Sequence, residues 1–139
     1  MASAAGVAQV APVQAVPIDL LRADLIAKSG GMTIYFGSGS AVIGAPARPM
    51  IGAQAQWLLL HPEVSLRVEG HGDPGDTRDH ALAIGARRAA ALREYYLLLG
   101  VPPGQVSIMS WGNERPGPPR ADLKLLAPSS GAPLEAAVR

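Results

Sequence analysis

The sequence predicts an α/β fold, in the form of a two-layer α+β sandwich with helices packed on one face of a small mixed sheet. Strand-like alternation and helix-like periodicity follow one another in the order strand, helix, strand, helix, strand, strand. Helical connections favour parallel pairing between the first strands, and a loop connection favours antiparallel pairing of the last two. The length of 139 residues fits one domain with some chain left for tails.

The first third of the chain contains an arm, a short helix and a strand. We expect a flexible arm over residues 1–17, which are rich in Ala, Val, Gln and Pro without a helical period. A short helix and linker follow over 18–30, because a Ser-Gly-Gly break ends the apolar residues there. Alternation over 32–36 predicts a strand. A proline suited to a first helical turn precedes an apolar stripe that predicts a helix over 46–60.

The middle of the chain carries the longest predicted helix. Alternating apolar residues predict a strand over 64–69, followed by a polar loop over 70–76. Apolar residues three and four positions apart then predict a helix over 77–99, with Gly100 as the residue that ends it.

The last third of the chain holds the two remaining strands. We expect a strand over 106–111, a Pro/Gly loop over 113–119 and a weaker strand over 123–126. Residues 127–139 are expected to form a disordered tail.

Composition excludes several classes of protein. The chain has no cysteine, which rules out disulfides, thiolate metal sites and a cysteine nucleophile. A net charge of +1 and 4% aromatic residues give neither the basic field nor the stacking surfaces typical of nucleic-acid binding. The longest apolar run is too short for a transmembrane segment. No Lys or Arg precedes Arg22, so we expect either the mature form of an exported protein or a cytosolic chain.

Asp73 and Arg88 are the main candidate site residues. Asp73 follows the second strand, and Arg88 lies about three turns into the next helix. A strand-loop-helix unit brings such residues together at the carboxyl end of a strand, where open α/β sheets bind ligands. A carboxylate beside a guanidinium suits a ligand that carries both an ammonium and a carboxylate. The same pattern also fits a structural ion pair that fixes the loop to the helix.

Other polar clusters do not match known reactive motifs. The segment GHGDPGD at 70–76, with Asp79 and His80, has neither EF-hand nor HExxH spacing, so no metal site is expected. The stretch GSG at 37–39 lacks a following GK[ST], which favours a plain turn over a phosphate loop. No G-x-S-x-G elbow is present. We therefore expect a protein that is not an enzyme and needs no cofactor.

Several motifs in this chain match one family. The most specific are GHGD at 70–73 and LAIGARRA at 82–89, supported by TIYFGSGSAVI at 33–43 and VSIMSWGNERPG at 106–117. Over residues 31–126 the chain resembles the OmpA-like peptidoglycan-binding domain, most of all its branch of peptidoglycan-associated lipoproteins. The resemblance implies the OmpA-C-like βαβαββ fold.

The resemblance also implies a function. Members of the family bind the stem peptide of peptidoglycan non-covalently at its diaminopimelate residue, whose free end is an ammonium beside a carboxylate. It implies that Asp73 holds the ammonium, that Arg88 holds the carboxylate, and that the loop of Gly37, Ser38, Gly39 and Ser40 completes the pocket. It further implies a periplasmic, outer-membrane-associated protein in a Gram-negative envelope, with peptidoglycan and possible Tol components as partners.

The sequence departs from the family pattern around this pair. Gly37 and Gly39 stand where the family has acidic residues, and Pro118-Pro119-Arg120 replaces its NRR motif, so that Arg120 is the one arginine of that pair left for the ligand. The lipid-bearing cysteine is absent. A second hypothesis is therefore a degenerate domain of the same fold that serves as a structural or protein-interaction subunit of a larger assembly.

Overall fold

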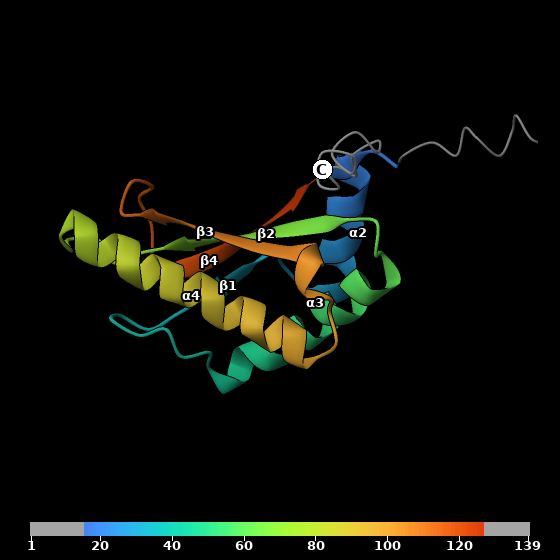
Figure 1. Ribbon diagram of the computed structural model, residues 1–139, viewed down its shortest axis with the longest axis horizontal. Coiled ribbons are helices and arrows are strands. Elements are labelled where there is room, and N and C mark those ends of the chain that lie inside the picture. Colours follow the sequence, from blue (N-terminus) through green and yellow to red (C-terminus); the bar gives the residue numbers. More distant parts are fainter. Residues whose placement is uncertain (1–15, 127–139) are drawn as a thin grey trace, which may run out of the picture.

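The computed structural model describes residues 16–126, so the expected tail and nearly all of the expected arm lie outside the described residues. The fold class is confirmed: helices and a mixed sheet form two layers (Figure 1). In chain order the elements are α2 (Ile18–Ser29), β1 (Thr33–Tyr35), η1 (Ala45–Ala47), α3 (Arg48–Leu60), β2 (Ser65–His71), α4 (Arg78–Leu98), η2 (Pro103–Gln105), β3 (Val106–Gly112) and β4 (Arg120–Leu126).

The sheet has the strand order β1-β4-β2-β3. β2 and β3 are parallel, and β4 is antiparallel to both β1 and β2. Two expectations about pairing were therefore wrong: β1 and β2 are not neighbours, and the last two strands do not pair with each other. The last strand is also longer than expected. Every second residue of β4 is buried (Ala121, Leu123 and Leu125), which agrees with its central position in the sheet. Ser107 and Ile108 of β3 are exposed, which agrees with the position of β3 at an edge.

One hydrophobic core lies between the sheet and the helices. Leu66 and Val68 of β2 are fully buried in it with Leu92 and Tyr96 of α4. Complete burial of one such side chain contributes about 1.5–3 kcal/mol relative to its exposure. Leu25 of α2 belongs to the same core, so this first helix packs with the rest of the domain.

Two buried glutamines stabilise the core by pairing polar groups. The hydroxyl of Tyr96 donates a 2.7 Å hydrogen bond to Gln54, and burial raises the pKa of Tyr96 far above its usual range. Nε2 of Gln105 lies within hydrogen-bond distance of the carbonyl oxygens of Leu58, His61 and Val64, at 2.9–3.0 Å. Gln105 thereby fixes the turn from α3 into β2. Sequence patterns did not indicate the role of Gln54 or of Gln105, because the hydrogen-bond partners of each glutamine lie far away in the chain.

Glycines allow β2 and α4 to approach closely. A Cβ on Gly70 would overlap the carbonyl oxygen of Gly85, and a Cβ on Gly72 would lie 2.6 Å from the Cβ of Ala81. Both helix residues belong to the first half of α4. The close contact therefore sets the height of this half of the helix above the strand, and with it the position of Arg88.

We expect Gly70→Ala to lower the free energy of unfolding by at least about 1–3 kcal/mol, because the added methyl group forces the helix away from the strand. Denaturant unfolding measures this loss. Gly52→Ala is the matched control: Gly52 lies within α3 and a Cβ there meets nothing within 4 Å. That substitution should raise the free energy of unfolding by about 0.5–1 kcal/mol. Equal effects of the two changes would contradict the close-packing argument.

Candidate ligand-binding site

The loop that carries Asp73 joins β2 to α4 and is fixed at both ends. The N–H of Gly72 donates to the carbonyl of Gly112 at 2.7 Å, which ties the end of β2 to β3. At the other end, the Thr77 side chain accepts a hydrogen bond from the N–H of His80 and caps α4. Gly75 between them has φ 87°, a left-handed conformation that favours glycine. The loop therefore presents Asp73 in one defined position.

Arg88 is fully buried and donates hydrogen bonds to two segments of the chain, loop 37–40 and the end of β2. Its Nε donates to the carbonyl of Ser40 at 2.8 Å, Nη1 to that of His71 at 2.8 Å, and Nη2 to that of Gly37 at 3.1 Å. The guanidinium also lies near the ring of Phe36, 5.7 Å from its centroid. Carbonyl oxygens thus satisfy a buried charge on the apolar side of a helix, where an arginine is otherwise costly.

Asp73 completes this arrangement by pairing with both the arginine and the first loop. Oδ1 lies 2.7 Å from Nη2 of Arg88, while Oδ2 accepts hydrogen bonds from the Gly39 N–H at 2.6 Å and the Ser38 hydroxyl at 3.2 Å. Burial by itself would raise the pKa of Asp73. The Gly39 N–H, Arg88 and Ser38 outweigh that effect and hold the pKa below its ordinary value.

The structure brings together most of the residues that the sequence indicated. Asp73 and Arg88 meet, and loop 37–40 bonds to both of them through backbone groups and the Ser38 hydroxyl. Arg120 is placed differently. Its guanidinium donates to Asp122 and to the Pro118 carbonyl, and among the described residues it makes no contact with Asp73.

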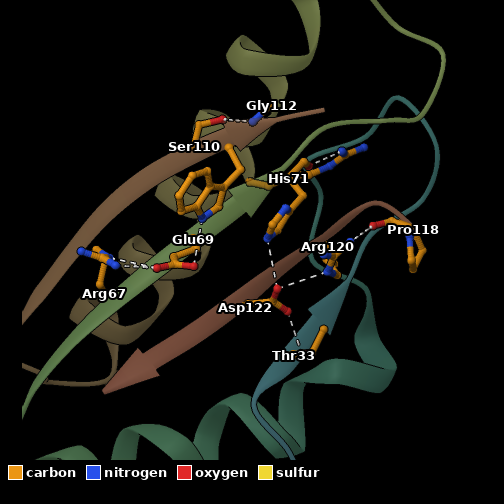
Figure 2. Close-up of polar contacts among 11 residues, drawn as sticks. Thr33, Arg67, Glu69, His71, Ser110, Gly112, Pro118, Arg120 and Asp122 are labelled. Atoms are coloured by element: carbon orange, nitrogen blue, oxygen red, sulfur yellow. Dashed lines mark hydrogen bonds and ion pairs between the residues drawn. The ribbon is translucent and has the colours of Figure 1, made fainter. Parts of the chain in front are cut away.

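A second polar network lies beside the site on the side of the sheet that the helices leave open. Figure 2 shows Asp122 of β4 between His71, Arg120 and Thr33. Nε2 of the buried His71 lies 3.0 Å from Asp122 Oδ2, which makes an ion pair when the imidazole is protonated. Burial alone would raise the pKa of Asp122, but the contacts of its carboxylate with His71 and Thr33 lower it below the ordinary value.

This network touches the candidate site through His71, because the carbonyl of the same residue accepts a hydrogen bond from Arg88. Sequence analysis missed the role of His71. The available signal was the run Arg67, Glu69 and His71, in which every second residue of an apolar strand is polar. The sequence analysis instead ended this strand at 69 and assigned His71 to the loop over 70–76, whereas β2 extends to His71.

The centre of the site is the charge pair of Asp73 and Arg88. Within residues 16–126, no three His, Asp or Glu side chains gather in a way that would hold a metal ion. None of the helices in this part of the chain is long and apolar enough to cross a membrane. The chemistry that the arrangement offers is recognition of opposite charges at a carboxylate and a guanidinium.

Fold and site together define a class of protein. The OmpA family model matches residues 35–122, and the chain belongs to the OmpA family. Both Asp73 and Arg88 lie within the matched range. Among characterised relatives, the chain is similar to the peptidoglycan-associated lipoproteins of Brucella melitensis, with 44% identity over 86 residues, and of Rhizobium meliloti, with 43% over 86 residues. These matches cover 62% of this chain and 51% and 49% of the relatives, so the chain spans about half the length of the relatives it matches.

Solved structures show the same architecture. The crystal structure of the peptidoglycan-associated lipoprotein from Burkholderia pseudomallei matches with a TM-score of 0.67 and 30% identity, covering 70% of this chain and 92% of that one. The periplasmic domain of Helicobacter pylori MotB matches with a TM-score of 0.61 at 17% identity, covering 76% of each chain, which shows the shared fold alone.

We expect Asp73→Asn to lower the free energy of unfolding by about 1–3 kcal/mol at neutral pH, because the buried Arg88 loses its counter-charge. A depressed carboxylate pKa stabilises the folded state above the unfolded-state pKa of about 3.9, and this contribution is lost as the pH falls through the folded-state pKa. The difference in the free energy of unfolding between the parent and Asp73→Asn should therefore become smaller below about pH 4. Urea unfolding at a series of pH values measures this difference.

The control for this series is Asp79→Asn, because Asp79 is exposed in the first turn of α4. Its effect should stay within about 0.5 kcal/mol. If the free energies of unfolding of the parent and of Asp73→Asn differed by the same amount at every pH, the carboxylate charge would not stabilise the fold.

Proposed function

We propose that this chain is a non-enzymatic peptidoglycan-binding module of a Gram-negative cell envelope, which holds the stem peptide at its diaminopimelate residue. The observation that carries the proposal is the meeting of Asp73 and Arg88 at the carboxyl end of β2, framed by loop 37–40. The similarity to peptidoglycan-associated lipoproteins supports it. The opposite charges suit the ammonium and the carboxylate at the free end of diaminopimelate.

In the proposed complex, the ligand exchanges one internal charge pair for two pairs between protein and ligand. The ammonium binds Asp73, and the carboxylate binds the Nη2 group of Arg88 that now contacts Asp73. Each buried charge keeps a partner throughout, which avoids the cost of an unpaired buried ion. Because three carbonyl oxygens hold the guanidinium in place, Arg88 is already oriented before the ligand arrives.

Loop 37–40 completes the proposed pocket. Gly37 and Ser40 hold Arg88, and Ser38 and Gly39 hold Asp73, so this loop sets the spacing of both charges. Arg120 is proposed as an additional contact of the ligand. Its guanidinium, which binds Asp122 and the Pro118 carbonyl, must then leave these two partners.

The proposed place of action is the periplasm, in association with the outer membrane. The relatives named above are peptidoglycan-associated lipoproteins, and the OmpA-like fold is shared with a periplasmic domain of MotB. Peptidoglycan is the proposed partner, and Tol components of the envelope are further proposed partners.

Co-sedimentation with purified sacculi tests the proposal. We expect Asp73→Asn to weaken the free energy of binding by about 2–5 kcal/mol, since it leaves the ligand's ammonium without its partner. Arg88→Lys keeps the positive charge but loses the planar group that binds a carboxylate through two hydrogen bonds, so it should weaken binding as well. The matched control is Arg87→Ala, because Arg87 is the exposed neighbour of Arg88 on α4 and should bind as the parent does. Circular dichroism at the assay temperature verifies that each variant is folded.

Equal sedimentation of the parent and both site variants would exclude the proposed site. The complete burial of Arg88 favours one other function, in which the pair is structural and the domain is a scaffold or protein-interaction subunit of a larger assembly. Calorimetric titration with diaminopimelate separates the two. A measurable heat that Asp73→Asn abolishes supports the ligand site, whereas no heat together with stable co-purification of a defined protein partner supports the scaffold.

A further inference from the structure

The free edge of β1 presents backbone groups that have no partner in the sheet. β1 pairs only with β4, and the hydrogen bonds at its two ends run from Leu123 N–H to the Met32 carbonyl and from Phe36 N–H to the Pro119 carbonyl (Figure 1). In an antiparallel ladder, hydrogen-bonded positions alternate with positions that point away. The N–H and C=O groups of Thr33 and Tyr35 therefore point out of the sheet. Within residues 16–126, no hydrogen bond satisfies these four groups from outside the ladder.

An apolar groove lies alongside this edge. It has a volume of about 410 Å³, and its lining away from β1 includes Val42, Pro46 and Ala47 from the segment that leads into α3, and Met50 from the first turn of that helix. Val42 is 75% exposed, so the groove is open to solvent at that residue. Its size is within the range of ordinary ligand pockets, and it combines apolar walls with a row of hydrogen-bonding groups.

These two features fit a peptide strand better than a second copy of the chain. A residue placed opposite Ile34 in an added strand faces the same side as Ile34, which is the side of the groove. If the β1 strands of two copies paired, that position would be occupied by the partner's own Ile34, whose side chain is buried in its core at 1% exposure. The groove would stay empty. A short peptide has no core of its own, so its side chain opposite Ile34 can occupy the groove.

We propose that the free edge of β1 is a docking site for an extended peptide segment of a partner protein. The segment adds to the sheet as a fifth strand through the backbone groups of Thr33 and Tyr35, and its residue opposite Ile34 is apolar and occupies the groove. Strand addition of this kind draws affinity from main-chain hydrogen bonds and specificity from the pocket for alternate side chains. The groove reaches Gly37 of loop 37–40, but the backbone groups that bind the segment are those of Thr33 and Tyr35, so the proposal does not depend on the proposed function.

The test uses two acetylated and amidated pentapeptides, Ser-Thr-Val-Thr-Ser and Ser-Thr-Asp-Thr-Ser, titrated into the isotope-labelled protein at millimolar concentrations. We expect the valine peptide to shift the amide resonances of Thr33 and Tyr35 and to slow their exchange with solvent. The aspartate peptide should bind about tenfold or more weakly, because its charge enters an apolar groove.

Two variants of Tyr35 provide the matched comparison. Tyr35→Pro removes an outward N–H without breaking a hydrogen bond to β4, and Tyr35→Thr keeps that N–H. We expect the proline variant to bind the valine peptide about tenfold or more weakly and the threonine variant to bind as the parent does. Absence of a response at the Thr33 and Tyr35 amides, equal binding of the two peptides, or equal binding by the proline variant would each overturn the proposal.

Discussion

The buried guanidinium of Arg88 is the interaction on which the site depends. It connects the first loop to the end of β2 and to the Asp73 loop that follows it, two parts of the chain that are more than 30 residues apart. A buried charge is tolerated when its hydrogen bonds are satisfied and a counter-charge lies next to it, and removing either partner of such a pair is destabilising. The same residue thus links the stability of this end of the domain to the proposed recognition of a zwitterion. The structural and the ligand-binding interpretations of the pair are compatible, because the contacts that orient Arg88 are backbone carbonyls that a ligand does not displace.

Local patterns predicted much of this arrangement. The helices 46–60 and 77–99 were expected within two residues of their observed ends, because apolar periodicity, a proline in a first turn and Gly100 as a terminator are local signals. The meeting of Asp73 and Arg88 also followed from local order, since a strand, a tight loop and a helix return the chain over the same edge of a sheet.

What the sequence left open depends on contacts between distant segments. β4 was expected to be short and to pair with β3, but it lies between β1 and β2 and contacts α4, which ends 22 residues before β4 begins, and α2, which is farther away in the chain. The pairing of His71 with Asp122 follows from that strand order, so it could not be inferred before the order was known. The ion pair of Arg120 with Asp122 of the same strand was likewise not indicated by the sequence.

The central position of β4 also has a consequence for biosynthesis. Until residues 120–126 have been synthesised, β1 has no partner strand and β2 has only one of its two neighbours. Pairings between such distant segments form slowly, because the chain must close a long loop before any contact compensates for the lost entropy. While the ribosome is still extending the chain, α3, β2, α4 and β3 can associate, but the first loop has no fixed strand behind it. The site that Arg88 organises is therefore completed only after the last strand of the domain has left the ribosome.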